Sequence, residues 1–293
     1  MEVPTLKQFV SGPWKAACFN RYKPSTQRRT VSALRTQLIP AFGRERMDCI
    51  GPFAVRKWFD RYSRTAPAGA NRTLDILRQI FNYAIECGHA SLNPTRGVRH
   101  NPRPRVTRFL SRDEVTRVYA VLDAHRGRGS GRQQAAIIRL LILTGCRKGE
   151  VVHLRWAEVH GNILRLADSK TGPRVVFLSA AARAILMRQH RNESPYVFPS
   201  LKDLSKPRSD ELSLWRKVRK VAGLDDVRLH DLRHTFASHA VMHGVPLPVL
   251  CHLLGHSHDR MALRYAHVSD RELEEAAERI GILLAQAMEQ APE

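Results

Sequence analysis

One segment of the sequence, residues 230–267, constrains the fold more than any other. It opens with His-Asp-Leu-Arg-His-Thr-Phe, continues through Leu-Leu-Gly-His-Ser-His and ends with Arg-Tyr-Ala-His. His230 and Arg233 are three residues apart, which puts both side chains on one face of a helix. Gly255 ends the next short helix, and His256 therefore lies at a helix boundary, where a side chain can point into a cleft. Two imidazoles, a guanidinium and a phenol separated by apolar stretches indicate a catalytic site for a phosphate.

A second motif lies upstream of this segment. Residues 141–150 read Leu-Ile-Leu-Thr-Gly-Cys-Arg-Lys-Gly-Glu, which is the end of an apolar helix, a glycine break and then Arg147, with Glu150 opening the next helix. Between the two motifs, Asp-Ser-Lys-Thr-Gly at 168–172 separates two short strand-like runs and puts Lys170 in their turn. Taken alone, a His-x-x-Arg pair or a lysine in a turn is usually only a solvated surface group. The evidence for a catalytic site is therefore the order in which all of these residues occur along the chain.

This ordered set resembles the active site of the tyrosine recombinase (phage integrase) family, and its members are Arg147, Lys170, His230, Arg233, His256 and Tyr265. The words around these residues match as well: Leu-Arg-Trp after the first arginine, His-Thr-Phe-Ala-Ser after the second, and Leu-Leu-Gly-His-Ser before the tyrosine. The resemblance covers residues 108–268 and is weaker over the first hundred. It implies a site-specific DNA recombinase that acts as a homotetramer on double-stranded DNA, with possible accessory DNA-bending or directionality proteins.

The chemistry of a phosphodiester gives these side chains their expected roles. Charge that develops on the phosphorus centre must be neutralised, and a guanidinium stays charged and matches phosphate oxygens with its planar fork. We therefore expect Arg147 and Arg233 to bind the phosphate. Tyr265 is the expected nucleophile, and the resemblance implies a covalent 3′-phosphotyrosine with a free 5′-hydroxyl.

The remaining roles follow from the resemblance. Lys170 would protonate the 5′ oxygen, and His230 would assist proton transfer at Tyr265 or hold a phosphate oxygen. His256 would donate to a non-bridging oxygen. A carboxylate, Glu150 in preference to Asp231, would orient an arginine or an imidazole of the site.

Charge supports a nucleic-acid partner. The net charge is +21, which exceeds what solubility requires and indicates a polyanion. Residues 1–100 carry 17 basic and 6 acidic side chains, so the N-terminal part is the more densely basic. The tail 270–293 reverses the sign, with 7 acidic and 2 basic side chains, and should face protein or water.

No cofactor or metal is expected. The five cysteines are scattered and contain no Cys-x-x-Cys pair, so neither a disulfide framework nor a zinc site is indicated. Strand exchange through a phosphotyrosine conserves bond energy, and no Gly-x-x-x-x-Gly-Lys-Ser/Thr loop for ATP is present. The sequence has no apolar run of membrane-spanning length and no signal pattern, so we expect a cytoplasmic, nucleoid-associated protein.

The length of 293 residues suits two domains. We expect a helical core-type DNA-binding domain at 1–99, a basic linker at 100–107 and a catalytic domain at 108–293. Arginines on helix polar faces and around the proline-rich linker are the expected DNA contacts, namely Arg28, Arg29, Arg35, Arg99, Arg103, Arg105 and Arg108. The first of these domains also fits a plain solvated bundle and the linker a plain connector, although the charge favours DNA. The chain starts almost directly at these helices, so the further arm-binding domain of many phage integrases is expected to be absent or removed.

The expected fold is mainly α with a small antiparallel β-sheet, as in a two-domain tyrosine recombinase. In the second domain a capping box at Ser111 and Glu114 opens a helix. Strands are expected at 163–166 and 174–178, and further helices at 133–143, 179–190, 209–221, 229–243 and 246–254. An acidic helix at 269–290 carries an apolar stripe that packs either on its own domain or on a neighbouring protomer.

Two other functions fit parts of this pattern. A type IB topoisomerase uses similar chemistry as a monomer and would relax supercoiled DNA that lacks a special site. A basic helical DNA-binding regulator with decayed motifs would bind without cleavage, although all six candidate positions hold chemically competent residues.

Overall fold

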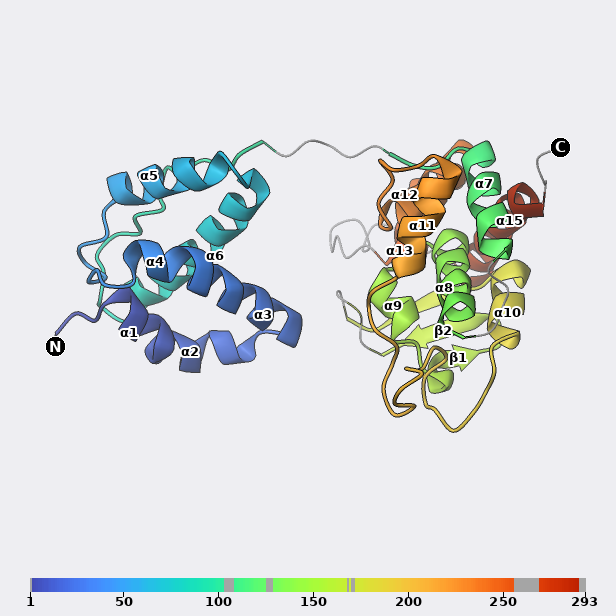
Figure 1. Ribbon diagram of the computed structural model, residues 1–293, viewed down its shortest axis with the longest axis horizontal. Helices are drawn as coiled ribbons and strands as arrows, with labels where there is room; N and C mark the ends of the chain where they lie inside the picture. Colours follow the sequence, from blue (N-terminus) through green and yellow to red (C-terminus); the bar gives the residue numbers. More distant parts are fainter. Residues whose placement is uncertain are drawn as a thin grey trace. The chain divides into compact units, whose positions relative to one another are not determined.

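A computed structural model of the chain describes residues 2–102, 108–124, 129–167, 169, 172–255 and 269–289. The chain forms two compact units, residues 1–105 and 106–293 (Figure 1). Each unit has its own apolar core.

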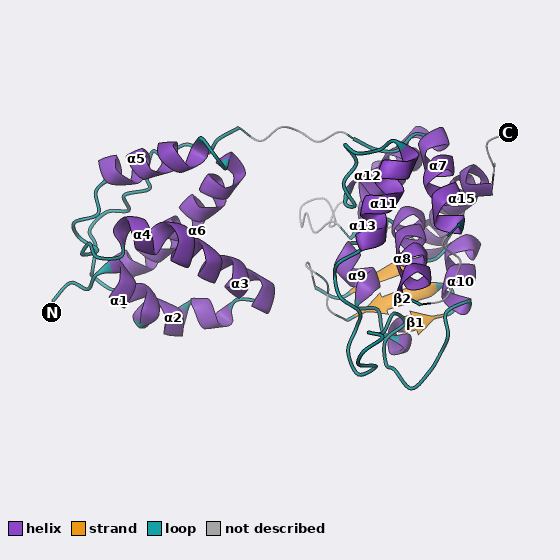
Figure 2. Ribbon diagram, viewed as in Figure 1, coloured by secondary structure: helices purple, strands orange, loops and turns teal. Residues whose placement is uncertain are grey.

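The first unit is helical in its described part (Figure 2). Its elements are α1 (Leu6–Ser11), α2 (Pro13–Ala17), η1 (Phe19–Arg21), α3 (Pro24–Ala33), η2 (Leu34–Leu38), α4 (Ile39–Phe42), α5 (Pro52–Ser63) and α6 (Pro67–Glu86). Proline is the first residue of four of these helices, a position where its missing N–H is not needed. Large side chains such as Phe9, Trp14, Leu74 and Phe81 fill the core between them.

The helical segment from Pro24 to Phe42 is interrupted. It begins at Pro24, turns into a π-helical segment at Leu34–Leu38 and continues as α4 to Phe42. Pro40 lies just beyond the π-helical turn and has no N–H to donate to the preceding turn, which explains why the regular α-helical bonding is broken here.

The second unit combines helices with one small sheet. Its elements are α7 (Arg112–Asp123), α8 (Ser130–Thr144), α9 (Lys148–Val152), η3 (Trp156–Glu158), β1 (Val159–His160), β2 (Ile163–Leu166), β3 (Arg174–Phe177), α10 (Ala180–Met187), α11 (Ser213–Ala222), α12 (Asp231–Met242), α13 (Leu247–Leu254) and α15 (Asp270–Glu289). The predicted capping box at Ser111 and Glu114 is present at the start of α7. The apolar α8 is buried on nearly all sides and forms the centre of the core.

The sheet is antiparallel in the order β1-β2-β3. Leu164 pairs with Val176 and Leu166 with Arg174, which fixes the register of the hairpin that β2 and β3 form. Strands β2 and β3 match the prediction. Strand β1 was not predicted, because two residues are too short to show an alternating pattern.

The acidic helix α15 packs on its own unit, against α7, α8, α10 and α13. Leu273, Ala277, Ile280 and Leu284 are its buried stripe. Of the two packing partners considered for this helix, the protomer's own unit is therefore the one observed. Among the described helices, none combines the length and apolarity that crossing a membrane requires.

Candidate active site

Arg147 is placed by the break between α8 and α9. Gly145 ends α8 in the left-handed conformation with φ of 60°, and an added Cβ there would lie 2.7 Å from the ring of Phe236. Arg147 then takes an extended conformation as the N-cap of α9. Its side chain is about one-fifth exposed, so the guanidinium lies at the surface of the unit while its backbone is fixed below.

Glu150 holds Arg147 in this position. Its carboxylate accepts a hydrogen bond from the backbone N–H of Arg147 at 2.8 Å and one from Nη1 of the same residue at 2.9 Å. The side chain of Glu150 is only 5% exposed. Burial acts to raise its pKa, but the charge of Arg174 and the hydrogen bonds from both arginines outweigh it and hold the pKa below the ordinary value. Glu150 is therefore ionised at neutral pH and can orient Arg147.

Arg233 lies deeper than Arg147. It projects from the first turn of α12, is 6% exposed, and donates from Nη1 to the carbonyl of Gly145 and from Nη2 to that of Leu254, each at 2.7 Å. Burial, together with the charges of Arg147 and Arg174, lowers its pKa to about 10. These positive groups repel one another, so an anion bound among them would relieve the repulsion. A phosphate has the charge and the oxygen atoms for this place.

His230 is the N-cap of α12 and shares its first turn with Arg233. Its ring meets that of His234 edge-on, with 5.2 Å between centroids. The side chain remains accessible to solvent, yet the protein atoms around the ring desolvate it, and this lowers its pKa below the ordinary value. The nearby charges of His234 and Arg233 act in the same direction. The neutral imidazole is therefore favoured, and it can accept a proton.

The alternative carboxylate, Asp231, has a different partner. It is fully buried and binds Arg228, whose Nη2 lies 2.7 Å from Oδ1 and whose backbone N–H donates to Oδ2 at 2.7 Å. The described hydrogen bonds of Asp231 hold Arg228 at the start of α12, whereas those of Glu150 hold Arg147.

Arg174 is a residue of this cluster that the sequence did not single out. It is the first residue of β3, it is 7% exposed, and its Nη2 lies 2.8 Å from Oε2 of Glu150. Its Nη1 donates to the carbonyl of Leu253 at 3.1 Å. The only available signal was a charged residue at the start of an otherwise apolar strand, close to the turn that contains Lys170.

Three of the predicted catalytic residues lie outside the described residues, namely Lys170, His256 and Tyr265. The described chain reaches the turn of Lys170 from both sides, and it ends at Gly255 before the segment of His256 and Tyr265. The structure thus brings together Arg147, Arg233 and Glu150, with His230 on the same helix as Arg233.

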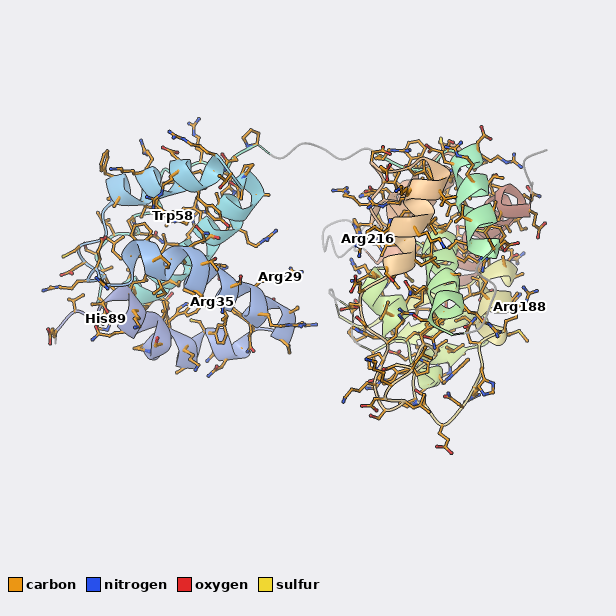
Figure 3. All side chains as sticks on the ribbon, in the orientation of Figure 1. Arg29, Arg35, Trp58, His89, Arg188 and Arg216 are labelled. Carbon is orange, nitrogen blue, oxygen red and sulfur yellow. The ribbon has the colours of Figure 1, made fainter. Side chains whose placement is uncertain are left out.

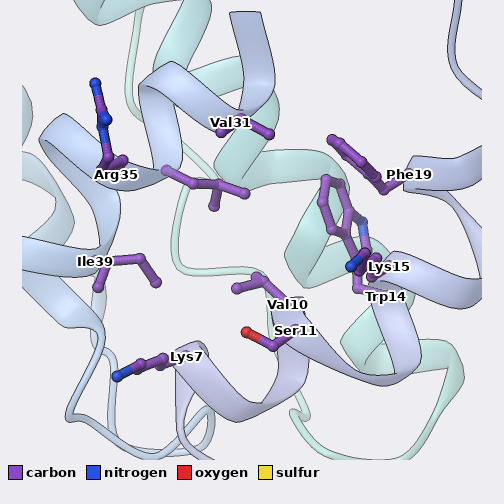
Figure 4. A pocket seen from close by; sticks show the side chains of 10 residues that line it. Lys7, Val10, Ser11, Trp14, Lys15, Phe19, Val31, Arg35 and Ile39 are labelled. Atoms are coloured by element: carbon purple, nitrogen blue, oxygen red, sulfur yellow. The ribbon is translucent and has the colours of Figure 1, made fainter. Parts of the chain in front are cut away.

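The predicted DNA-contacting arginines on the helices of the first unit are exposed. Arg28 and Arg29 come from α3 and Arg35 from η2, and Figure 3 labels the latter two. Arg99 is exposed as well, whereas Arg103 and Arg105 lie outside the described residues. Arg35 borders a hollow of about 370 Å³ that is lined by apolar side chains, and Val10 and Val31 lie on opposite sides of it in Figure 4. The nitrogen atoms of Arg35 and Lys7 lie at its margin.

Arg108 differs from these arginines. Its Nη2 lies 2.7 Å from Glu114 and its Nε 2.7 Å from Asp226, and both hydrogen bonds raise its pKa above the ordinary value. Two carboxylates already offset its charge, so we expect a smaller contribution to DNA binding than from the exposed arginines of the first unit.

Two of the tyrosines of the second unit already have other partners. The ring of Tyr119 lies under the guanidinium of Arg139, and that of Tyr196 under Arg155.

Across the described part of the chain, no group of three or more His, Cys, Asp or Glu side chains is arranged to hold a metal ion.

Comparison with known proteins identifies the family. Residues 108–272 match the family model described as "Phage integrase family", and residues 9–101 match the one described as "Phage integrase central domain". The chain is 33% identical to tyrosine recombinase XerC of Erythrobacter litoralis over 232 residues, which cover 75% of each protein. The chain belongs to the phage integrase family.

Two further similarities extend this result. The integrase of Salmonella phage P22 is 31% identical over 161 residues, which are 50% of this chain but only 42% of that protein. The lambda integrase of a solved tetramer superposes on 87% of this chain and 78% of its own with a TM-score of 0.69 and 18% identity, which shows a shared fold. The predicted fold class is confirmed. The family match and the XerC relative also confirm the predicted class of enzyme, a tyrosine recombinase.

Proposed function

We propose that this phage integrase family member is a site-specific DNA recombinase that breaks and rejoins DNA through Tyr265. The observation that supports this most directly is the cluster of Arg147, Arg233 and Glu150, in which two guanidiniums are fixed beside each other and ready for an anion. DNA phosphate is the anion that the net charge of +21 and the family favour.

In the proposed reaction the phenolic oxygen of Tyr265 attacks the phosphorus, and the bond between phosphorus and the 5′ oxygen breaks. His230 receives the phenolic proton, and Lys170 gives a proton to the 5′ oxygen. The products are a 3′-phosphotyrosine and a free 5′-hydroxyl. Attack by the 5′-hydroxyl of another strand reverses the step, so no net bond energy is lost. Arg147, Arg233 and His256 bind the non-bridging oxygens while negative charge develops on them.

The proposed assembly and division of labour follow from the family. The solved lambda integrase is a tetramer bound to a Holliday junction, and we propose a homotetramer on double-stranded DNA for this chain, working at the nucleoid. Residues 1–99 would bind the core-type DNA, residues 100–107 would link the two domains, and residues 108–293 would perform the chemistry.

Removal of Arg147 or Arg233 should slow cleavage by about 10²–10³-fold, as for other donors that stabilise an oxyanion.

The decisive experiment compares Tyr265→Phe with the wild type on a nicked suicide DNA substrate, which traps the covalent product. We expect an SDS-resistant protein–DNA adduct with the wild type and none with Tyr265→Phe, because the phenylalanine lacks the attacking oxygen. Tyr196→Phe is the matched control and should form the adduct, since that ring already contacts Arg155. An adduct with Tyr265→Phe would show that another residue is the nucleophile.

A further inference from the structure

Arg174 connects three parts of the second unit that the proposed reaction uses. It begins β3, four residues after Lys170 in the sequence. Its Nη2 lies 2.8 Å from Glu150, the carboxylate that also holds Arg147. Its Nη1 donates at 3.1 Å to Leu253, in the last turn of α13.

The end of α13 is fixed by two guanidiniums side by side. Arg174 binds the carbonyl of Leu253 and Arg233 that of Leu254. Gly255 caps this helix with φ of 62°, and a Cβ added to it would lie 2.6 Å from Cδ of Arg174. Gly255, which precedes His256 in the sequence, therefore lies directly against the side chain of Arg174.

From these contacts we propose that Arg174 is a positioning residue that holds Arg147, through Glu150, and the end of α13 in one fixed arrangement. The inference rests on the proposed function, because it assigns to Arg174 the alignment of the phosphate-binding arginine with the chain that carries the nucleophile. A carboxylate shared by two arginines cannot move toward one without changing its contact with the other.

The geometry favours positioning over direct phosphate binding. The side chain of Arg174 is 7% exposed, and both of its terminal nitrogens already donate to protein atoms. Arg147 is about three times as exposed and is the better placed of the two to meet a ligand. A lysine could not reproduce the arrangement, because its single ammonium lacks the planar fork that reaches Leu253 and Glu150 from separate nitrogens.

The test measures the first-order rate of adduct formation at saturating suicide substrate, together with DNA affinity. We expect Arg174→Met to slow adduct formation by about 10²-fold, the scale of a 1 Å misplacement of reacting groups, and to leave affinity within about twofold. The rate of Arg174→Lys should lie between those of the wild type and Arg174→Met, because lysine retains the positive charge beside Glu150 but lacks the planar fork of the guanidinium. Arg139→Met is the matched control, since Arg139 is also poorly exposed and paired, but with Asp123. Its rate should stay near that of the wild type.

A second substrate separates positioning from a general loss of structure. In a methylphosphonate linkage the phosphorus centre is neutral, so the reaction depends less on a well-placed Arg147. The ratio of the methylphosphonate rate to the phosphate rate should therefore rise about 10-fold in Arg174→Met, as in Arg147→Met. A loosened fold would slow both substrates by the same factor.

The outcomes distinguish this inference from the proposed function. If the wild type forms no adduct, the proposed function fails. If the wild type forms an adduct, two results for Arg174→Met would show that Arg174 does not position Arg147. In the first, the variant has the wild-type rate and the wild-type ratio of methylphosphonate to phosphate rates. In the second, both of its rates fall but that ratio is unchanged. Should Arg174→Met fail to fold, Arg174→Lys is judged by the same ratio.

Discussion

At the scale of single residues, the site is a balance of buried charges. Glu150 is a single carboxylate between Arg147 and Arg174, and Arg233 lies close enough for both of those charges to lower its pKa. Such a cluster is not arranged for stability, because burying charges costs solvation energy that pairing only partly returns. Its excess of positive charge is what a bound phosphate would neutralise.

His230 gives a prediction for the pH dependence of stability. Its pKa is lowered in the folded protein, so between that value and the ordinary one of about 6.5 the unfolded chain binds more protons. Its contribution to stability is therefore present above the ordinary pKa and is lost as the pH falls through that range. Urea unfolding at pH 7.5, 6.0 and 5.0 should show the wild type losing stability relative to His230→Gln. A gain at low pH would contradict the assigned shift.

At the scale of elements, the site is built from helix ends. Gly145 ends α8 just before Arg147, and Gly255 ends α13 just before the segment of His256 and Tyr265. Arg233 joins these two ends through the carbonyls of Gly145 and Leu254. Helix C-terminal carbonyls have no partner within the helix, so a buried guanidinium satisfies them and fixes the helices to each other.

The packing of α15 gives a prediction at this scale. Gly281 of α15 lies against the buried Ser179, and a Cβ at this glycine would collide with the serine side chain. Glycine to alanine normally stabilises a helix by up to about 1 kcal/mol, but here overpacking of about 1–3 kcal/mol reverses the sign. Gly281→Ala should therefore lower the Tm of the second unit by a few degrees.

The matched control for that prediction is Gly131→Ala in the first turn of α8, where an added Cβ meets open space. It should leave the Tm unchanged or raise it. Differential scanning calorimetry of both variants makes the comparison, and a raised Tm for Gly281→Ala would mean that α15 does not pack closely on Ser179 in solution.

At the scale of the whole molecule, charge sets the interaction with DNA. The net charge is +21, and the first hundred residues carry the denser share of it. Arg28, Arg29 and Arg35 are exposed on one continuous helical segment, and no carboxylate forms an ion pair with them among the described residues. Long-range attraction of this kind depends on counterion release and is weakened by salt.

Salt titration tests this electrostatic contribution. With ~6–10 phosphate contacts, the affinity for DNA should fall by about 10³–10⁵ between 50 and 200 mM salt. Arg35→Ala should reduce the slope of log affinity against log salt by about 1, because one phosphate contact is lost. Arg271→Ala is the control, since this exposed arginine is paired with Glu275 on the acidic helix α15. Fluorescence anisotropy gives both slopes, and equal slopes for the two variants would remove Arg35 from the DNA contacts.

Much of this protein could be predicted from sequence, because local patterns carry local information. Apolar periodicity predicted the main helices, alternation predicted β2 and β3, and a Ser-x-x-Glu pattern predicted the start of α7. The order of basic side chains around glycine breaks indicated the family and its chemistry. The roles of Lys170, His256 and Tyr265 stay predictions, because these residues lie outside the described part of the chain.

Contacts between distant segments were decided by the tertiary structure alone. Arg174 is 24 residues from Glu150 and 79 from Leu253, and no local pattern relates the three. The same holds for α15, whose apolar stripe fits a neighbouring protomer as well as its own unit until Gly281 is seen against Ser179. A sequence records which side chains an element offers, but burial, charge balance and close approach depend on what the rest of the chain brings next to it.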